Sequence, residues 1–467
     1  MLISKRALGA SAVVVVLALL PVIRLPGARA ADTGLQLVAS QQLSSRLVEL
    51  TFRTDALTSD TRVRILLPDG YDPSGHTRYP VLYLLHGAFD DYRAWTDKGG
   101  AAASTAGLPL IVVMPDGGSE GNYTNWYNFG AGGPPRWETY HIDQLVPWID
   151  THLPTIAARR GRAVAGLSMG GNGALAYAAL HPDLFSAAAS FSGAVDTNNE
   201  EEQVVTGLGG LPDGRPPGAI FGLRATDEVR WRGHNPWDLA ANLGGMLVEL
   251  DVGNGAPGGP DGNGFDPVEE SVHEQSVAVH DQLLALGVTH VWDDYGPGAH
   301  NFYYWSRDLR QFLPRLMDEF AHPVAPTRVT YRTIQPGFSE FGWQASVQRP
   351  ALEFAELSGA DSSGFTLRGS GTATVVTPPV YRPGSTVTAT VADEQGTHAV
   401  VVAVGSDRRV RLDLTIGPAN PYQAYTAEAR TYALTSAFDK GLGYSIDRAT
   451  GNGTLVYTVR VSLAVTR

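Results

Sequence analysis

Short apolar runs that alternate with helical segments dominate residues 79–320. The predicted strands of this part lie at residues 79–85, 109–114, 163–167, 185–193, 245–251 and 289–295. The continuous apolar run at 79–85 is typical of a strand buried on both faces. Helical spacing is found at residues 137–149, 172–180, 267–287 and 303–320. Strands that alternate with helices predict parallel βαβ units and therefore an α/β sheet.

The pattern differs at both ends of this part and in one stretch inside it. Residues 35–67 alternate with period two, which predicts antiparallel strands leading into the sheet. Residues 196–235 are polar and rich in turn signals, so we expect an irregular surface insertion. From residue 329 onward the chain is rich in Val, Thr and Gly, with short alternating runs that predict an all-β sandwich. The expected division is a first domain at 31–321, a linker at 322–328 and a β-sandwich domain at 329–467.

Residues 1–30 have the features of a secretory signal peptide. Lys5 and Arg6 form a charged start, an apolar core covers residues 11–21, and Ala28-Arg-Ala30 matches a cleavage site. The apolar run is too short to span a bilayer. We therefore expect a secreted protein, in the extracellular space or the cell envelope, with no stable membrane span after cleavage.

Composition narrows the range of partners. The net charge is −12, and no basic run is present, which argues against a nucleic-acid partner. The chain has no cysteine, so an exported form has no disulfides and depends on core burial for stability. We recognise no cofactor-binding or metal-binding motif and expect neither a cofactor nor a metal.

The sequence Gly166-Leu-Ser168-Met-Gly170 is the most specific local signal. It joins an apolar strand to an alanine-rich helix, which is the context of a nucleophile elbow. Glycines on both sides let the strand turn sharply, so that the Ser168 hydroxyl is presented at the helix N-terminus. A serine nucleophile needs a base, and the base needs an acid that orients it.

His300 is the candidate base, because it lies on a Gly/Pro loop after the last predicted strand of the sheet. The acid belongs between the serine and the histidine in chain order. Several carboxylates qualify from position alone, and the residues do not rank them: Asp251, Asp261, Asp266, Glu269 and Glu270. Backbone N–H groups of Met169, after the serine, and of Ala88, after His86-Gly87, are the candidate donors of an oxyanion hole.

These motifs, in this order, resemble the esterase D and secreted mycolyltransferase (antigen 85 type) family of α/β hydrolases. The matching landmarks are Tyr83-Leu-Leu-His-Gly87, Met114-Pro-Asp-Gly117, Asn125-Trp-Tyr-Asn128, Trp137-Glu-Thr139, Gly166-Leu-Ser-Met-Gly170 and Gly298-Ala-His-Asn-Phe-Tyr-Tyr-Trp305. The resemblance implies an α/β-hydrolase fold for residues 31–321. It also implies a glutamate near the start of the helix at 267–287 as the acid, which selects Glu269; an esterase D-like spacing selects Asp266 instead.

Two departures from the mycolyltransferases weaken a mycolate or trehalose specificity but leave ester chemistry intact. Phe89 stands where that family has an arginine, in a shorter loop, and the family disulfide is absent.

The predicted function is a secreted serine esterase or acyltransferase that uses Ser168, His300 and Glu269 on a small-molecule, lipid or sugar ester. The alternatives are mycolyltransferase-like transfer to a sugar acceptor and a non-catalytic cell-surface binding protein on a hydrolase fold. A cell-envelope glycan is a further candidate partner. Aromatic residues near the expected mouth are candidates for lining a lipid or sugar cleft: Phe89, Trp95, Trp126, Tyr127, Trp231 and Trp305.

Overall fold

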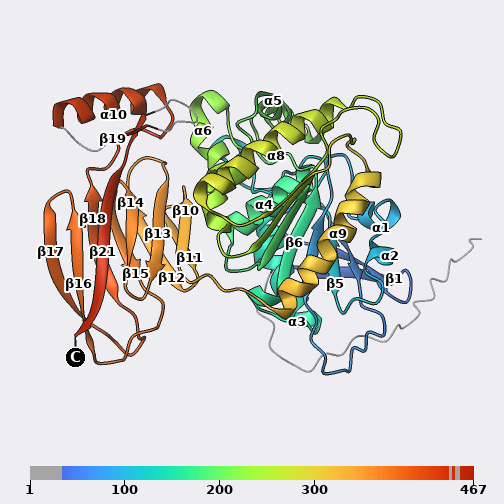
Figure 1. The fold of residues 1–467 in the computed structure, drawn as a ribbon, viewed down its shortest axis with the longest axis horizontal. Helices are drawn as coiled ribbons and strands as arrows, with labels where there is room; N and C mark the ends of the chain where they lie inside the picture. Colours follow the sequence, from blue (N-terminus) through green and yellow to red (C-terminus); the bar gives the residue numbers. More distant parts are fainter. Residues whose placement is uncertain (1–33, 441–443, 447–452, 467) are drawn as a thin grey trace, which may run out of the picture.

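The computed structural model describes residues 34–440, 444–446 and 453–466, and the predicted signal peptide lies outside them. Two parts lie side by side in Figure 1, an α/β part and a part made mostly of β-strands. Among the described residues, no helix is long and apolar enough to cross a bilayer.

A nine-stranded mixed sheet forms the centre of the α/β part, in the order β1-β2-β3-β5-β4-β6-β7-β8-β9. The strands from β1 to β3 pair antiparallel, β3 pairs antiparallel with β5, and the remaining pairs are parallel. This is the predicted α/β-hydrolase fold, with its antiparallel entry strands. The strands are β1 (Gln36–Gln42), β2 (Leu47–Arg53), β3 (Thr61–Leu66), β4 (Val81–Leu85), β5 (Ile111–Pro115), β6 (Arg162–Leu167), β7 (Ala187–Phe191), β8 (Leu247–Val252) and β9 (Val291–Asp294).

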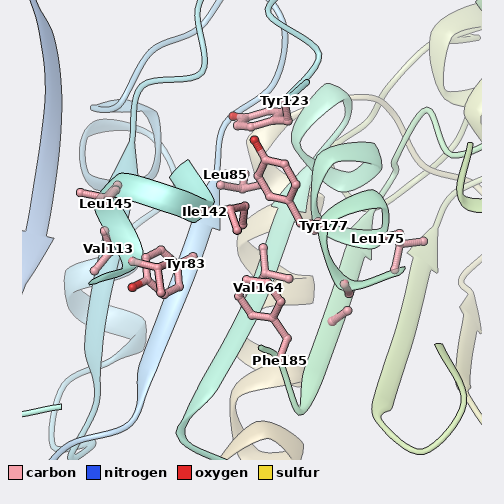
Figure 2. Close-up of a cluster of buried hydrophobic side chains, with 14 of the residues drawn as sticks. Tyr83, Leu85, Val113, Tyr123, Ile142, Leu145, Val164, Leu175, Tyr177 and Phe185 are labelled. Carbon is pink, nitrogen blue, oxygen red and sulfur yellow. The ribbon is translucent and has the colours of Figure 1, made fainter. Parts of the chain in front are cut away.

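Helices cover both faces of this sheet. Alternate residues of β4 divide between two apolar clusters, with Tyr83 and Leu85 on one face and Leu82 and Leu84 on the other. The first cluster packs under α3 (Val146–His152), α4 (Met169–Leu180) and α8 (Pro267–Leu286). Figure 2 shows Tyr83, Val113 and Val164 on this face, together with Tyr177 and Leu175 of α4. The second packs under α1 (Ala94–Asp97), α2 (Ala101–Ser104) and α9 (Phe302–Ala321).

The segment predicted as an irregular insertion, residues 196–235, is partly helical. It contains α5 (Glu200–Leu208) and α6 (Arg224–Arg232), with a short 3-10 turn η4 (Leu211–Asp213) between them. Asn199 caps α5, because its side chain accepts hydrogen bonds from the N–H groups of Glu201 and Glu202. The expectation of an irregular segment is therefore wrong for these two helices.

Further short elements complete the α/β part. They are η1 (Asn128–Gly130), a π-helical segment η2 (Thr139–Leu145), η3 (Arg159–Gly161), α7 (Pro236–Leu239) and η5 (Ala240–Leu243). The helix predicted at 137–149 is thus η2 followed by α3.

The second part begins at β10, after α9 has ended at Ala321. It contains a six-stranded antiparallel sheet in the order β10-β13-β14-β21-β16-β17 and a four-stranded one in the order β11-β12-β15-β18. Inward side chains of both sheets share one apolar cluster, as in a sandwich. The strands are β10 (Val329–Thr333), β11 (Gly337–Glu340), β12 (Trp343–Gln348), β13 (Ala355–Asp361), β14 (Gly364–Gly369), β15 (Gly371–Val376), β16 (Thr386–Asp393), β17 (Gly396–Ala403), β18 (Arg411–Gly417) and β21 (Tyr457–Thr466).

One helix, α10 (Ala427–Lys440), interrupts this β-rich part and was not predicted. It is followed by the short pair β19 (Tyr444–Ile446) and β20 (Gly453–Leu455).

Candidate active site

Ser168 lies at the turn between β6 and α4, with φ 54° and ψ −122°. Such a backbone conformation costs on the order of 1–3 kcal/mol for a residue with a side chain. Close approach explains the flanking glycines: a Cβ on Gly166 would lie 2.2 Å from the Gly170 carbonyl oxygen, and one on Gly170 would lie 2.5 Å from that of His86. The local geometry is therefore that of the predicted elbow, and Ser168 is half-buried.

Other residues with side chains and positive φ lie nearby in the topology. They follow the carboxyl ends of neighbouring strands: Phe89 after β4, Asn122 and Tyr123 after β5, and Ser192 after β7. Ligands of open α/β sheets bind at this edge. Strained loops that gather there indicate a functional site.

His300, in the loop before α9, meets Glu269 in the first turn of α8. His300 Nδ1 lies 2.8 Å from Glu269 Oε2, and the Glu269 side chain is fully buried. Its other oxygen accepts hydrogen bonds from the Ser192 hydroxyl at 2.8 Å, the Gly253 N–H at 2.7 Å and the Tyr295 hydroxyl at 3.3 Å. This carboxylate is thus held in one orientation. His300 Nε2 is buried and has no hydrogen-bond partner among the described residues.

Asp266, the acid that an esterase D-like spacing selects, makes different contacts. It is the N-cap of α8, and its Oδ1 accepts hydrogen bonds from the N–H groups of Val268 and Glu269. Its Oδ2 accepts from the backbone N–H of His300 at 2.8 Å. Asp266 therefore ties the His300 loop to the start of α8 but contacts the backbone of His300 and not its ring.

The remaining candidate acids do not contact His300. Burial and the nearby Glu249 carboxylate raise the pKa of Asp251 well above its usual value, and neither Asp251 oxygen has a partner in the described part of the chain. Asp261 accepts a hydrogen bond from the Tyr304 hydroxyl at 2.7 Å. Glu270 is exposed. Of the five carboxylates left open by the sequence, only Glu269 pairs with the imidazole.

The loop after β4 approaches the elbow closely. A Cβ on Gly87 would lie 2.6 Å from Leu167 Cδ1 and 3.2 Å from Ser168 Cβ. Ala88 and Met169, the predicted oxyanion donors, both line the cavity that contains Ser168. Met169 is the first residue of α4, so its N–H has no acceptor within the helix.

A buried histidine orients this loop. His86 Nε2 accepts the Gly117 N–H at 2.8 Å, so Nδ1 carries the proton and donates to the Gly87 carbonyl oxygen, also at 2.8 Å. The Gly87 carbonyl and the Ala88 N–H belong to the same planar peptide and point in opposite directions. Fixing the carbonyl therefore also fixes the direction of the Ala88 N–H.

Ser168 and His300 line one cavity of about 490 Å³. Its walls come from the loops after β4 and β5, from α5 and from the start of α8. Three apolar side chains that line it are strongly exposed, Phe89, Val205 and Val268. The sequence did not predict the wall from α5, because that segment was expected to be irregular.

Of the aromatic residues considered for the cleft, only Phe89 lines this cavity. The expectation is wrong for the four tryptophans, which are buried: Trp95, Trp126, Trp231 and Trp305. Trp305 packs edge-on against the His300 ring at 4.9 Å and supports it from below the cavity surface.

Comparisons with known proteins agree with the class of enzyme that this fold and elbow define. A family model described as "Putative esterase" matches residues 54–316, more than half of the chain. The chain therefore belongs to this esterase family, as the motifs predicted.

Two relatives show the range of named activities. Esterase Rv1288 of Mycobacterium tuberculosis is 38% identical over 275 residues, which is 58% of this chain and 59% of the relative. The chain thus spans little more than half the length of that relative. Diacylglycerol acyltransferase/mycolyltransferase Ag85B of Mycobacterium leprae is 30% identical over 262 residues, covering 52% of this chain and 77% of the relative. Among solved structures, M. tuberculosis MPT51 (FbpC1) is similar with a TM-score of 0.47 and 23% identity, over 57% of this chain and 96% of that one.

Proposed function

We propose that this protein is a secreted serine esterase or acyltransferase in which Ser168, His300 and Glu269 form a catalytic triad. The observation that carries the proposal is the 2.8 Å contact between His300 Nδ1 and the buried Glu269 carboxylate, in a cavity that Ser168 shares. Because Nδ1 donates to Glu269, Nε2 is the nitrogen left to accept the serine proton.

In the first half of the proposed reaction, the Ser168 oxygen attacks the ester carbonyl carbon while its proton moves to His300 Nε2. The carbonyl oxygen becomes an oxyanion that accepts hydrogen bonds from the Met169 and Ala88 N–H groups. Collapse breaks the bond to the alcohol oxygen, which takes the proton from His300 and leaves an acyl-serine. Glu269 stabilises the imidazolium that forms in between.

In the second half, water or another alcohol attacks the acyl-serine and passes its proton to His300. That proton returns to the Ser168 oxygen when the acyl group leaves. Hydrolysis and acyl transfer differ only in which acceptor reaches the acyl-enzyme.

Replacement of the nucleophile tests this assignment. Ser168→Ala is expected to lower kcat for p-nitrophenyl esters by about 10⁴-fold or more, because a serine is required for the acyl-enzyme. The native protein is expected to take one fluorophosphonate label, on Ser168. Retained turnover in the variant would contradict the role of Ser168, and absence of labelling would favour a non-catalytic binding protein.

Acyl transfer to a sugar hydroxyl is the second candidate function. The 30% sequence identity with the Ag85B mycolyltransferase, over 77% of that relative's length, favours it. Product analysis with an ester donor, with and without trehalose or arabinan, separates the two activities. An acylated sugar supports transfer, and free acid alone supports hydrolysis.

Export and glycan binding belong to the same proposal and rest on the sequence alone. Secretion predicts that the mature protein in culture medium begins after Ala30, which N-terminal sequencing of the exported chain checks.

Binding of a cell-envelope glycan predicts retarded migration of the full chain in glycan affinity electrophoresis, and unchanged migration would remove that partner.

A further inference from the structure

The Ser168 cavity is lined by polar groups that the proposed triad does not use. Glu202 of α5 and Gln275 of α8 both line this cavity, and they are only 8% and 2% exposed. Side chains buried this deeply normally have all their hydrogen bonds made. Each of these two side chains has one polar atom with no hydrogen-bond partner among the described residues.

The spare group of Gln275 is a donor. Its Oε1 accepts the backbone N–H of Asp196 at 3.2 Å. A backbone N–H can only donate, so the amide oxygen occupies that side and the NH₂ group lies on the other. No described residue accepts a hydrogen bond from this NH₂ group.

The spare group of Glu202 is an acceptor. Its Oε1 accepts the hydroxyl of Thr206, one turn further along α5, and no described residue pairs with its second oxygen. Burial raises the pKa of Glu202 to about 7, and the Asp196 carboxylate adds to the rise. Near neutral pH this carboxyl group can accept a hydrogen bond and, when protonated, also donate one.

We propose that Glu202 and Gln275 bind a hydroxyl group of the ester substrate that lies outside the ester bond. A hydroxyl donates one hydrogen bond and accepts others, which matches the acceptor of Glu202 and the donor of Gln275. Glu120 and Glu201 line the same cavity, so a carboxylate or phosphate there would be repelled. The preferred substrate is therefore a neutral, hydroxylated ester. This inference rests on the proposed ester chemistry.

The burial of Glu202 and Gln275 predicts that the enzyme discriminates between esters with and without this hydroxyl. A substrate with a methyl group in place of the hydroxyl displaces water from both side chains and offers them no hydrogen-bond partner. Sites that bind a hydroxyl reject the analogue without it strongly. We expect kcat/KM to favour the hydroxylated member of an isosteric pair by about 10-fold or more.

Two substrate pairs test this and show where the hydroxyl belongs. Ethylene glycol monobutanoate against propyl butanoate places it on the alcohol portion. Ethyl β-hydroxybutyrate against ethyl isovalerate places it on the acyl portion. Release of acid in a pH-stat at fixed pH gives kcat/KM for each ester with the full-length enzyme.

Three exchanges identify the residues responsible. Glu202→Gln keeps the oxygen that accepts from Thr206 but replaces the spare acceptor by a donor. Gln275→Glu keeps the oxygen that accepts from Asp196 but removes the spare donor. Each is expected to lower the hydroxyl preference several-fold, and the double variant, which has a donor and an acceptor in exchanged positions, is expected to recover part of it. Glu200→Gln, exposed on the same helix and outside the cavity lining, is the control and keeps the native ratio.

The outcomes separate this inference from the proposed function. The inference is supported if the native enzyme prefers the hydroxylated ester of either pair, both single variants lower this preference, and the double variant partly recovers it. Equal rates within both pairs in the native enzyme overturn it while leaving the esterase intact, as do single variants with the native ratio or a double variant without recovery. Absence of turnover on every ester overturns the proposed function itself.

Discussion

At the scale of single residues, the neighbours of Glu269 distinguish it from the other carboxylates. Three donors hold one of its oxygens, and the imidazole of His300 contacts the other. Asp266 positions His300, because its carboxylate caps α8 and also accepts a hydrogen bond from the backbone N–H of His300. The proposed acid, Glu269, and the carboxylate that supports His300 thus both come from the start of one helix.

The roles of these two acids predict unequal effects. Glu269→Gln is expected to lower kcat by about 10³–10⁴-fold, because an amide cannot stabilise the imidazolium and favours the wrong tautomer of His300. Asp266→Asn keeps an oxygen for the helix cap but replaces the acceptor of the His300 N–H, so we expect a loss on the order of 10-fold. Steady-state kinetics with one p-nitrophenyl ester compares the two. A larger loss in Asp266→Asn would make Asp266 the acid.

At the scale of elements, short sequence motifs predicted those features whose geometry depends on residues close together in the chain. The elbow and the loop of His300 could be located because each carries a distinctive short sequence beside a strand. The acid could not be derived from the residues, because five carboxylates lie between the end of β8 and the first turn of α8, and only the tertiary contact with His300 distinguishes one of them. The resemblance selected Glu269, and the paired imidazole agrees with that choice.

Helix α5 and the hydrogen-bond donors around Glu269 carry no such local motif. Helix α5 has three glutamates in its first turn and no strong apolar stripe, so its sequence resembles a solvated loop. Its buried side chains include Glu202 and Thr206, which a hydrophobicity pattern does not detect. Ser192, Gly253 and Tyr295 are likewise ordinary loop residues in sequence, and only the fold brings them to Glu269.

Helix α5 also predicts how the cavity treats an acyl chain. Val204 and Val205 are similarly exposed, at 60% and 57%, but only Val205 lines the cavity. Val205→Ser is expected to lower kcat/KM for long-chain p-nitrophenyl esters by about 3–10-fold, since apolar contact area is lost, and to affect the acetate ester little. Val204→Ser is the matched control. Equal losses in the two variants would mean that Val205 does not contact the chain.

At the scale of the whole molecule, the β-rich part docks on the α/β part through several polar contacts. The Tyr331 hydroxyl donates to the Leu180 carbonyl oxygen at 2.8 Å, and Gln423 Nε2 donates to that of Thr226 at 2.6 Å. Near the first contact, burial and the adjacent Asp183 carboxyl raise the pKa of Glu340 to about 10.

Glu340 makes the stability of this contact depend on pH. Folded Glu340 keeps its proton up to about pH 10, whereas the unfolded chain releases it near the ordinary value of 4.5. The folded state binds more protons between these values, so the free energy of unfolding falls as pH rises through that window. We expect Tm to fall more steeply between pH 6 and pH 9 in the native chain than in Glu340→Gln. Glu394→Gln, an exposed substitution, should follow the native curve; parallel curves for all three would contradict the role of Glu340.

Strand β10 is an edge of the six-stranded sheet, paired on one side with β13. On its other side the Asn242 side chain accepts the Arg332 N–H at 2.7 Å and donates to the Arg332 carbonyl oxygen at 2.9 Å. An amide side chain thus occupies the place of a neighbouring strand. Uncovered strand edges are templates for aggregation. Residues 325–467 expressed alone should therefore self-associate, which size-exclusion chromatography beside the full chain detects; a monomeric fragment at the same concentration would show that the α/β part is not needed as a cover.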